Sequence, residues 1–335
     1  PVVRITEEAS RFAAENVMAE QKLRQTIRSR DEIGMLAESI DTMEERIHHY
    51  VEDLKVITAE RERISTELSL AARIQNNMLP TIFPAFPERT EFDIYASMTP
   101  AKEVGGDFYD FFMVDRDHLC ILIADVSGKG IPAALFMMAS KIILKNNAMM
   151  GKSPATVLEH TNYAICASNE EEMFVTVWLG VLEISTGKLT AANAGHEYPA
   201  LKTGDGKFEL YKDKHGFVVG GLPGMKYKEY EIQMEKGSTI FVYTDGLSEA
   251  SDEAEQMFGT DRILTALKND SEASPEGLLS NMKASVAAFV KDAEQFDDLT
   301  MLALTYYGAG APREEKKKEV NEEVSEENGE GEDPS

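Results

Sequence analysis

An apolar run that ends in a carboxylate occupies residues 119–130, Leu119-Cys120-Ile121-Leu122-Ile123-Ala124-Asp125-Val126-Ser127-Gly128-Lys129-Gly130. Such an unbroken aliphatic run, closed by glycines, predicts a buried strand that ends in a turn. Asp125 stands where this strand emerges from the core. Outward along the chain, other segments rich in β-branched and aromatic residues also predict strands: Phe92–Met98, His118–Asp125, Phe174–Leu182, Lys188–Ala194, Thr239–Thr244 and Thr300–Tyr306.

Helical segments interleave with these strands in two pairs. Ile131–Met150 and Pro154–Ser168 lie between the second and third strands, while Asp261–Lys268 and Pro275–Asp292 precede the last strand. Strands in runs with helices in pairs predict an α+β sandwich rather than a regular alternation of strand and helix. After Tyr307 the chain becomes rich in Gly, Glu, Lys and Ser, and residues 309–335 are predicted to be a disordered acidic tail.

The composition excludes several classes of function. Of 335 residues, 34 are Lys or Arg and 59 are Asp or Glu, which gives a net charge of −25 and argues against nucleic-acid binding. The longest apolar run falls far short of the ~20 residues that a membrane-spanning helix needs. The two cysteines, Cys120 and Cys166, have no disulfide or metal spacing, so a reducing compartment is expected.

An apolar seam at alternating steps of three and four predicts one long helix that begins near Ile33. It pairs most simply with a second copy as a parallel coiled-coil dimer; one helix lying on its own domain is the alternative. Arg61 and Gln75 are the polar interruptions, and the helix should stop at Leu79-Pro80. The seam comprises Ile33, Leu36, Ile40, Met43, Ile47, Tyr50, Leu54, Ile57, Arg61, Ile64, Leu68, Ala71, Gln75 and Met78.

Residues 1–50 resemble the HAMP linker of membrane receptors. An amphipathic helix over Val3–Asn16 and a polar connector over Gln21–Arg30 lead to Asp31-Glu32-Ile33-Gly34, the pattern that opens the second helix of that family. The resemblance implies a signalling linker over residues 1–50 and a coiled-coil regulatory linker helix over residues 51–80. It also implies that the chain is the cytoplasmic part of a bacterial membrane protein whose anchoring segment precedes Pro1.

Four acidic clusters stand at strand ends, and a new domain is predicted over residues 88–308. Each Asp-Gly pair alone is ordinary turn chemistry. Together, converging carboxylates would repel one another, a cost that a hard divalent cation with oxygen ligands removes. Mg²⁺ or Mn²⁺ is therefore expected, while the histidines lack zinc spacing. The clusters are Gly105-Gly106-Asp107-Phe108-Tyr109-Asp110, Asp125–Gly130, Asp245-Gly246-Leu247-Ser248-Glu249 and Asp297-Asp298-Leu299-Thr300.

These motifs, with Asn193-Ala194-Gly195-His196, resemble the SpoIIE/RsbU-like branch of the PPM (protein phosphatase 2C-like) serine/threonine phosphatases. The resemblance spans residues 64–306 and implies a sandwich of two antiparallel β-sheets flanked by helix pairs. It also implies that Asp125 bridges two Mn²⁺ or Mg²⁺ ions. Asp107 and the Val126 carbonyl would complete one ion, and Asp245 and Asp297 the other. These four aspartates form the expected catalytic set, which activates a water for attack on phosphate.

Other positions stay open at this point. Glu249 is either a ligand of a weaker third metal or a solvated turn residue. Ser127 stands where some relatives have a leaving-group histidine, and Lys102 and Lys129 are candidates for holding phosphate. His196 is interpreted as architectural. The remaining acids of the motifs, Asp110 and Asp298, are interpreted as supporting residues or caps.

The family implies hydrolysis of phosphoserine or phosphothreonine on a signalling protein, with a phosphorylated STAS-domain anti-anti-sigma factor as the usual substrate. Control would come through the N-terminal coiled coil. The alternative is a catalytically silent HAMP and coiled-coil scaffold that binds a signalling partner, although all four aspartates are present. A two-metal nuclease is disfavoured because a basic groove is missing from the sequence.

Overall fold

A computed structural model describes residues 1–15, 21–204 and 206–310. The chain divides into two compact units, residues 1–74 and 75–335. Most of the predicted acidic tail lies outside the described residues, as does Asn16 at the predicted end of the first helix. Within the described part, no helix has both the length and the apolar character needed to cross a membrane.

The first unit consists of α1 (Val2–Glu15), α2 (Leu23–Thr26) and most of α3 (Glu32–Asn76). Ile5, Leu23, Ile27 and Ala37 form its small core. The buried carboxylate of Asp41 accepts hydrogen bonds from two backbone N–H groups at the start of α2, at 2.8 and 2.9 Å. The short connector is thereby held to the long helix.

The Asp31-Glu32-Ile33-Gly34 motif begins α3 as predicted. The Asp31 side chain accepts a hydrogen bond from the Ile33 N–H at 3.1 Å, which satisfies a free donor of the first turn. A Cβ atom on Gly34 would lie only 2.1 Å from the Ser29 carbonyl oxygen. This position therefore requires glycine because the connector packs directly on it.

The predicted long helix is confirmed, and the middle part of its apolar seam is exposed in the single chain, whereas Ile33 and Ile40 pack against the small core and Gln75 is buried. Ile47 is 40% exposed, Leu54 62% and Ile57 60%. Isolated helices of this kind gain little from propensity alone and depend on packing of an apolar face. The dimeric coiled coil stays a prediction.

The second unit contains two five-stranded sheets, ordered β1-β10-β9-β6-β7 and β2-β3-β4-β5-β8, with antiparallel pairing throughout the named ladders. The predicted α+β sandwich of two antiparallel sheets is confirmed. The strands are β1 (Phe92–Thr99), β2 (Phe108–Met113), β3 (His118–Val126), β4 (Val175–Glu183), β5 (Lys188–Ala194), β6 (Ala200–Lys202), β7 (Glu209–Leu210), β8 (Glu229–Gln233), β9 (Thr239–Tyr243) and β10 (Leu299–Tyr306).

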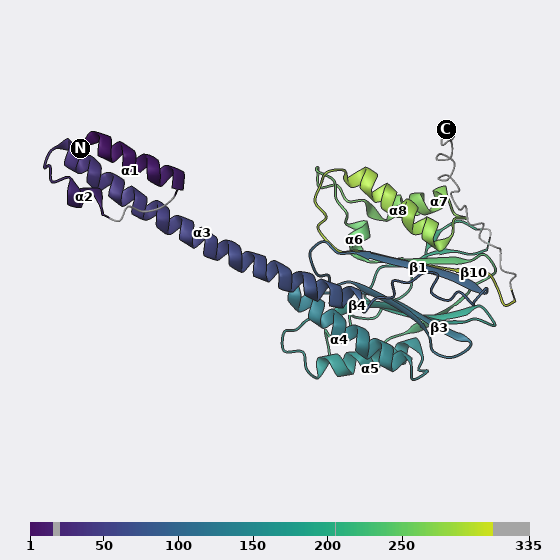
Figure 1. Ribbon diagram of the computed structural model, residues 1–335. Helices are drawn as coiled ribbons and strands as arrows, with labels where there is room; N and C mark the ends of the chain where they lie inside the picture. The colour runs from purple at the N-terminus through teal and green to yellow at the C-terminus, as the bar shows by residue number, and fades with distance from the viewer. Residues whose placement is uncertain (16–20, 205, 311–335) are drawn as a thin grey trace, which may run out of the picture. The chain divides into compact units, whose positions relative to one another are not determined.

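Helix pairs cover the two outer faces of the sandwich (Figure 1). α4 (Ile131–Ala148) and α5 (Pro154–Cys166) pack on the sheet that contains β3, and α7 (Gly259–Asn269) and α8 (Pro275–Val290) pack on the sheet that contains β10. The apolar run of β3 is completely buried between β2 and β4. Its burial on both faces explains why apolar residues do not alternate with polar ones there.

In the described part of the chain, four strands and two short helices were not predicted, and one of these helices, α2, lies inside the expected polar connector over Gln21–Arg30. β2 contains Asp110 and was interpreted as part of an acidic loop, while β6, β7 and β8 are short and partly polar. The short helix α6 (Asp245–Ser248) follows β9 directly. The aromatic residues of β2 are a strand signal that the sequence interpretation overlooked. The short strands β6, β7 and β8 have little apolar pattern of their own, and long-range pairing decides their conformation.

The proline-rich segment that follows α3 packs onto the sandwich. Leu79 belongs to its main core, and Phe83 and Phe86 contact that core. The Tyr109 hydroxyl donates a hydrogen bond to the Pro80 carbonyl at 2.8 Å. The segment therefore forms part of the second unit.

Candidate active site

The ladder between β2 and β3 brings two of the predicted aspartates together. Phe108 pairs with Ala124 in this antiparallel ladder, so Asp107 and Asp125 lie across from each other at one edge. Asp107 is 2% exposed, and its carboxylate accepts a hydrogen bond from the Thr244 hydroxyl at 2.7 Å. Thr244 directly follows β9, a strand of the other sheet. This hydrogen bond therefore connects the two sheets at the site.

The second sheet brings Asp245 and Asp297 to the same region. Asp245 follows β9 and Asp297 precedes β10, and these strands are antiparallel neighbours. A Cβ atom on Gly246 would lie 1.9 Å from the Asp298 carbonyl oxygen. Gly246 is therefore needed for close approach of two backbones, whereas the Asp-Gly pair alone had suggested ordinary turn chemistry.

Mutual repulsion and burial disturb the ionisation of these carboxylates. Burial, followed by the charges of Asp125 and Asp298, raises the pKa of Asp107 well above its usual range. Burial and the neighbouring Asp245 raise the pKa of Asp125 to about 7. For Asp245, burial and Glu249 raise the pKa to about 6. Such shifts mark a cluster that would be stabilised by a cation.

The donor set suits a hard divalent ion. It consists of carboxylate oxygens together with the Val126 carbonyl. A Cβ atom on Gly106 would lie only 3.1 Å from this carbonyl oxygen, so the loop before Asp107 packs closely on Val126. Within the described ranges, no three His, Cys, Asp or Glu side chains already stand in a metal-binding arrangement. Other groups contact two of these carboxylates: the Thr244 hydroxyl donates to Asp107, and the Lys129 ammonium lies 2.8 Å from Asp297.

Asp298 supports the site through the backbone. Its two carboxylate oxygens accept hydrogen bonds from the N–H groups of Ala101 at 2.9 Å, Gly106 at 2.7 Å and Asp107 at 3.3 Å. This agrees with its interpretation as a supporting residue. These hydrogen bonds, between residues more than 190 positions apart in the sequence, fix the loop that carries Asp107.

Gln75 holds the same loop from the opposite side. Its side-chain amide donates to the Gly105 carbonyl at 2.6 Å and accepts from the Gly105 N–H at 3.1 Å. Gln75 is only 2% exposed. Its polarity, which had been interpreted as an interruption of the coiled-coil seam, is explained by this pair of hydrogen bonds.

Asp110 has a structural role, because its ion pairs are with α4 and not with the four site carboxylates. The buried ammonium of Lys141 on α4 pairs with it, and Lys145 lies 3.2 Å from the same oxygen. Asp110 is fully buried. The pair therefore fastens α4 to β2.

The structure assigns His196 an architectural role, as the sequence suggested. Asn193 caps its own turn by accepting from the His196 N–H and donating to the His196 carbonyl, and Gly195 supplies the positive φ of 72°. His196 Nδ1 lies 2.8 Å from the Thr176 hydroxyl. Burial lowers the pKa of His196 to about 3, so the ring is neutral at physiological pH.

The remaining candidates divide into engaged and exposed groups. Ser127 accepts a hydrogen bond from the Phe174 N–H and so braces the end of β3. Lys129 is paired with Asp297, while Lys102 is exposed. Glu249 is also exposed, beside Asp245.

Glu197 is an acid that the sequence interpretation missed. Burial and the charge of Glu249 raise the pKa of Glu197, and its charge in turn acts on Asp245. The only sequence signal is its position directly after the Asn-Ala-Gly-His motif. The site therefore carries more negative charge than the four predicted aspartates supply.

A family model described as Stage II sporulation protein E (SpoIIE) matches residues 115–307. The chain belongs to the SpoIIE family. SpoIIE-family membership confirms the resemblance to the SpoIIE/RsbU-like phosphatases that the motifs had indicated. The matched region covers most of the sandwich, from the turn before β3 to the end of β10.

Among relatives of this SpoIIE-family chain, the phosphoserine phosphatase RsbU of Bacillus subtilis is 30% identical over 73% of the chain and 71% of its own length. Protein IcfG of Synechocystis is 28% identical over 91% of the chain and 51% of its own length, so the chain spans about half of that relative. The SiaA-PP2C domain of Pseudomonas aeruginosa shares the fold. Its TM-score is 0.63 at 24% identity, with 74% of this chain and 98% of that domain covered.

Proposed function

We propose that this chain is a metal-dependent protein phosphatase that hydrolyses phosphoserine or phosphothreonine on a signalling protein. One observation carries the proposal: each sheet of the sandwich delivers two aspartates to one region, where burial and repulsion raise the pKa values of three of them. Membership in the SpoIIE family supports the reaction class. The alternative, a silent scaffold, does not explain why so many carboxylates are kept close together at a cost in stability.

The residues that would hold the metal are Asp107, Asp125, the Val126 carbonyl, Asp245 and Asp297, with Glu249 for a weaker third ion. Mn²⁺ or Mg²⁺ at these oxygens would lower the pKa of a bound water and neutralise phosphate charge. The protein's own part is to fix the ligands. Asp298 and Gln75 hold the Asp107 loop from two sides, and Thr244 orients the Asp107 carboxylate.

The proposed substrate is the phosphoserine of a STAS-domain anti-anti-sigma factor. Support comes from the relationship to RsbU, whose name states that it is a phosphoserine phosphatase. The net charge of −25 makes a phosphorylated nucleic acid a poor alternative.

We also propose that residues 1–50 are a HAMP-like linker and that residues 51–80 form a coiled-coil dimer that controls the phosphatase. The parent protein would be anchored in the membrane through a preceding segment. The exposed apolar seam of α3 supports a partner helix, with Leu54 and Ile57 among its exposed members. Sedimentation of the intact chain should show a dimer, and replacing Leu54 and Ile57 by Glu should give a monomer; an unchanged mass would refute the coiled coil.

The experiment that tests the proposed activity measures Mn²⁺-dependent hydrolysis of an aryl phosphate and of a phosphoserine STAS-domain protein. The intact chain is compared with Asp245→Asn and with Asp261→Asn, an exposed aspartate on α7 that serves as the matched control. Activity that needs metal and is lost only in Asp245→Asn is the expected result. Failure to bind Mn²⁺ in calorimetry would instead favour the scaffold.

A further inference from the structure

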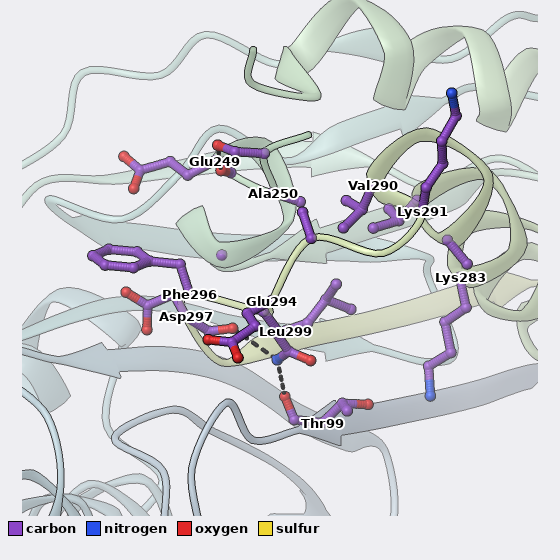
Figure 2. Close-up of a pocket in the computed structure, with 16 residues that line it drawn as sticks. Thr99, Glu249, Ala250, Lys283, Val290, Lys291, Glu294, Phe296, Asp297 and Leu299 are labelled. Atoms are coloured by element: carbon purple, nitrogen blue, oxygen red, sulfur yellow. Dashed lines mark hydrogen bonds between the residues drawn. The ribbon is translucent and has the colours of Figure 1, made fainter. Parts of the chain in front are cut away.

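A cavity of about 340 Å³ lies directly beside the candidate active site (Figure 2). Its walls come from the C-terminal half of α8, the end of α6 and the loop that leads into β10. Asp297 and Glu249 line it, so the cavity and the proposed metal site share residues. A volume of this size lies at the lower end of the range for ligand pockets.

The interior of the cavity is mainly apolar. Val286, Ala287 and Val290 of α8 face Leu299 and Ala250 across it. Apolar surface of this kind gains free energy when another apolar group displaces water from it. An aliphatic side chain therefore fits the chemistry of the walls better than a sugar or a second phosphate does.

The floor of the cavity is held in place by hydrogen bonds. The Gln295 side chain donates to the carbonyls of Thr99 at 2.8 Å and Asp297 at 2.7 Å, which ties the loop to the end of β1. Figure 2 shows these two bonds as dashed lines. A pocket tied in this way is formed before a ligand arrives, which reduces the ordering cost of binding.

Acidic and basic side chains lie on opposite sides of the cavity. Glu249, Asp297 and the exposed ring of Phe296 lie on one side in Figure 2, whereas Val290 and Lys283 of α8 lie on the other. Carboxylates on the first side belong to the proposed metal site, where the phosphate would be held. The cavity therefore lies within reach of a molecule whose phosphate is held at the proposed metal site.

We propose that this cavity is a specificity pocket for an apolar side chain that lies within three residues of the phosphoserine in the substrate protein. The proposal rests on the proposed phosphatase function of the neighbouring site. An extended chain advances about 3.3 Å per residue, so a side chain close in sequence to the phosphoserine can reach a cavity that shares a wall with the metal site. The shared residue Asp297 makes the two sites continuous.

The test uses synthetic phosphoserine peptides in an alanine background, with a single leucine moved from position −3 to position +3. We expect leucine at one position to raise kcat/KM about tenfold over the all-alanine peptide. Ala287→Phe fills the cavity and should abolish that preference. Rates are normalised to hydrolysis of an aryl phosphate by the same variant, and thermal melts check folding.

Ala288→Phe is the matched control, because Ala288 is an exposed neighbour on the same helix that does not line the cavity. It should keep the full leucine preference. Equal kcat/KM for all peptides, or a preference that survives Ala287→Phe, would overturn the pocket.

Peptide binding, followed by fluorescence anisotropy, separates this proposal from the proposed activity. Leucine-dependent binding without any Mn²⁺-dependent hydrolysis would overturn the phosphatase and leave the pocket supported. Hydrolysis without any leucine preference would do the reverse.

Discussion

Gln75, at the end of α3, forms two hydrogen bonds with the backbone of Gly105, two residues before Asp107. The amide replaces the two backbone partners that Gly105 would have in a sheet. A Cβ atom on Gly105 would lie 2.4 Å from a carboxylate oxygen of Asp298, so only glycine fits where this loop packs between Gln75 and Asp298. The position of Asp107 therefore depends on a side chain of the long helix.

Replacing Gln75 by Leu should weaken metal binding. Two buried backbone groups lose their partner, at a cost of about 1–3 kcal/mol each, and the Asp107 loop loosens. We expect a lower melting temperature and a Mn²⁺ requirement about tenfold higher or more. Asn76→Leu, at an exposed neighbouring position, is the control. Equal Mn²⁺ titrations for Gln75→Leu and the unmodified chain would contradict this role.

Metal should stabilise the protein more at high pH than at low pH. The pKa values of Asp125 and Asp245 are raised to about 7 and 6, so the stability that their protonated forms contribute is lost as pH rises through these values. A divalent ion replaces those protons. Thermal melts between pH 5 and 8, with Mg²⁺ or with chelator, should show a gap that widens as pH rises; a constant gap would refute the idea.

Gly246→Ala should disrupt the site by moving two backbones apart. The added methyl group would overlap the Asp298 carbonyl, which cannot rotate away as a flexible side chain could. We expect loss of Mn²⁺ binding together with lower thermal stability. Ser248→Ala, in the same short helix, should bind metal normally. Normal Mn²⁺ affinity in Gly246→Ala would show that this close approach is not needed.

Lys141→Met should destabilise the fold strongly. It leaves the Asp110 carboxylate buried without its main partner, at a cost of about 3–5 kcal/mol. Lys145→Met should cost less, because the Lys145 side chain is 44% exposed and that of Lys141 only 5%. Urea unfolding measures both. The double variant Asp110→Leu and Lys141→Met should recover most of the loss, and a deeper loss would count against the assignment.

The sequence predicted those elements whose own side chains decide their conformation. The strand β3, predicted from its aliphatic run, and the helix α3, predicted from its apolar seam, are of this kind, and both elements are confirmed. β2 was missed although its aromatic residues favour a strand, because Asp110 was interpreted as a loop residue; only the distant Lys141 explains why this acid is buried. Burial and pairing partners of this kind do not appear in local sequence.

The candidate site shows the same limit. That the four aspartates would gather could be inferred from their places at strand ends, because neighbouring antiparallel strands bring such ends together. The supporting contacts of Asp298 and Gln75, and the extra charge of Glu197, could not be inferred. Each depends on residues that are far apart in sequence and adjacent only after folding.

The geometry of the proposed site depends on how the two sheets are placed relative to each other, because its four aspartates are divided between them. Asp107 and Asp125 belong to one layer and Asp245 and Asp297 to the other, and the hydrogen bond from Thr244 to Asp107 crosses between them. Each layer therefore supplies only two of the four proposed ligands. A small shift of one sheet over the other would therefore separate the two pairs of proposed ligands while leaving both hydrophobic layers folded.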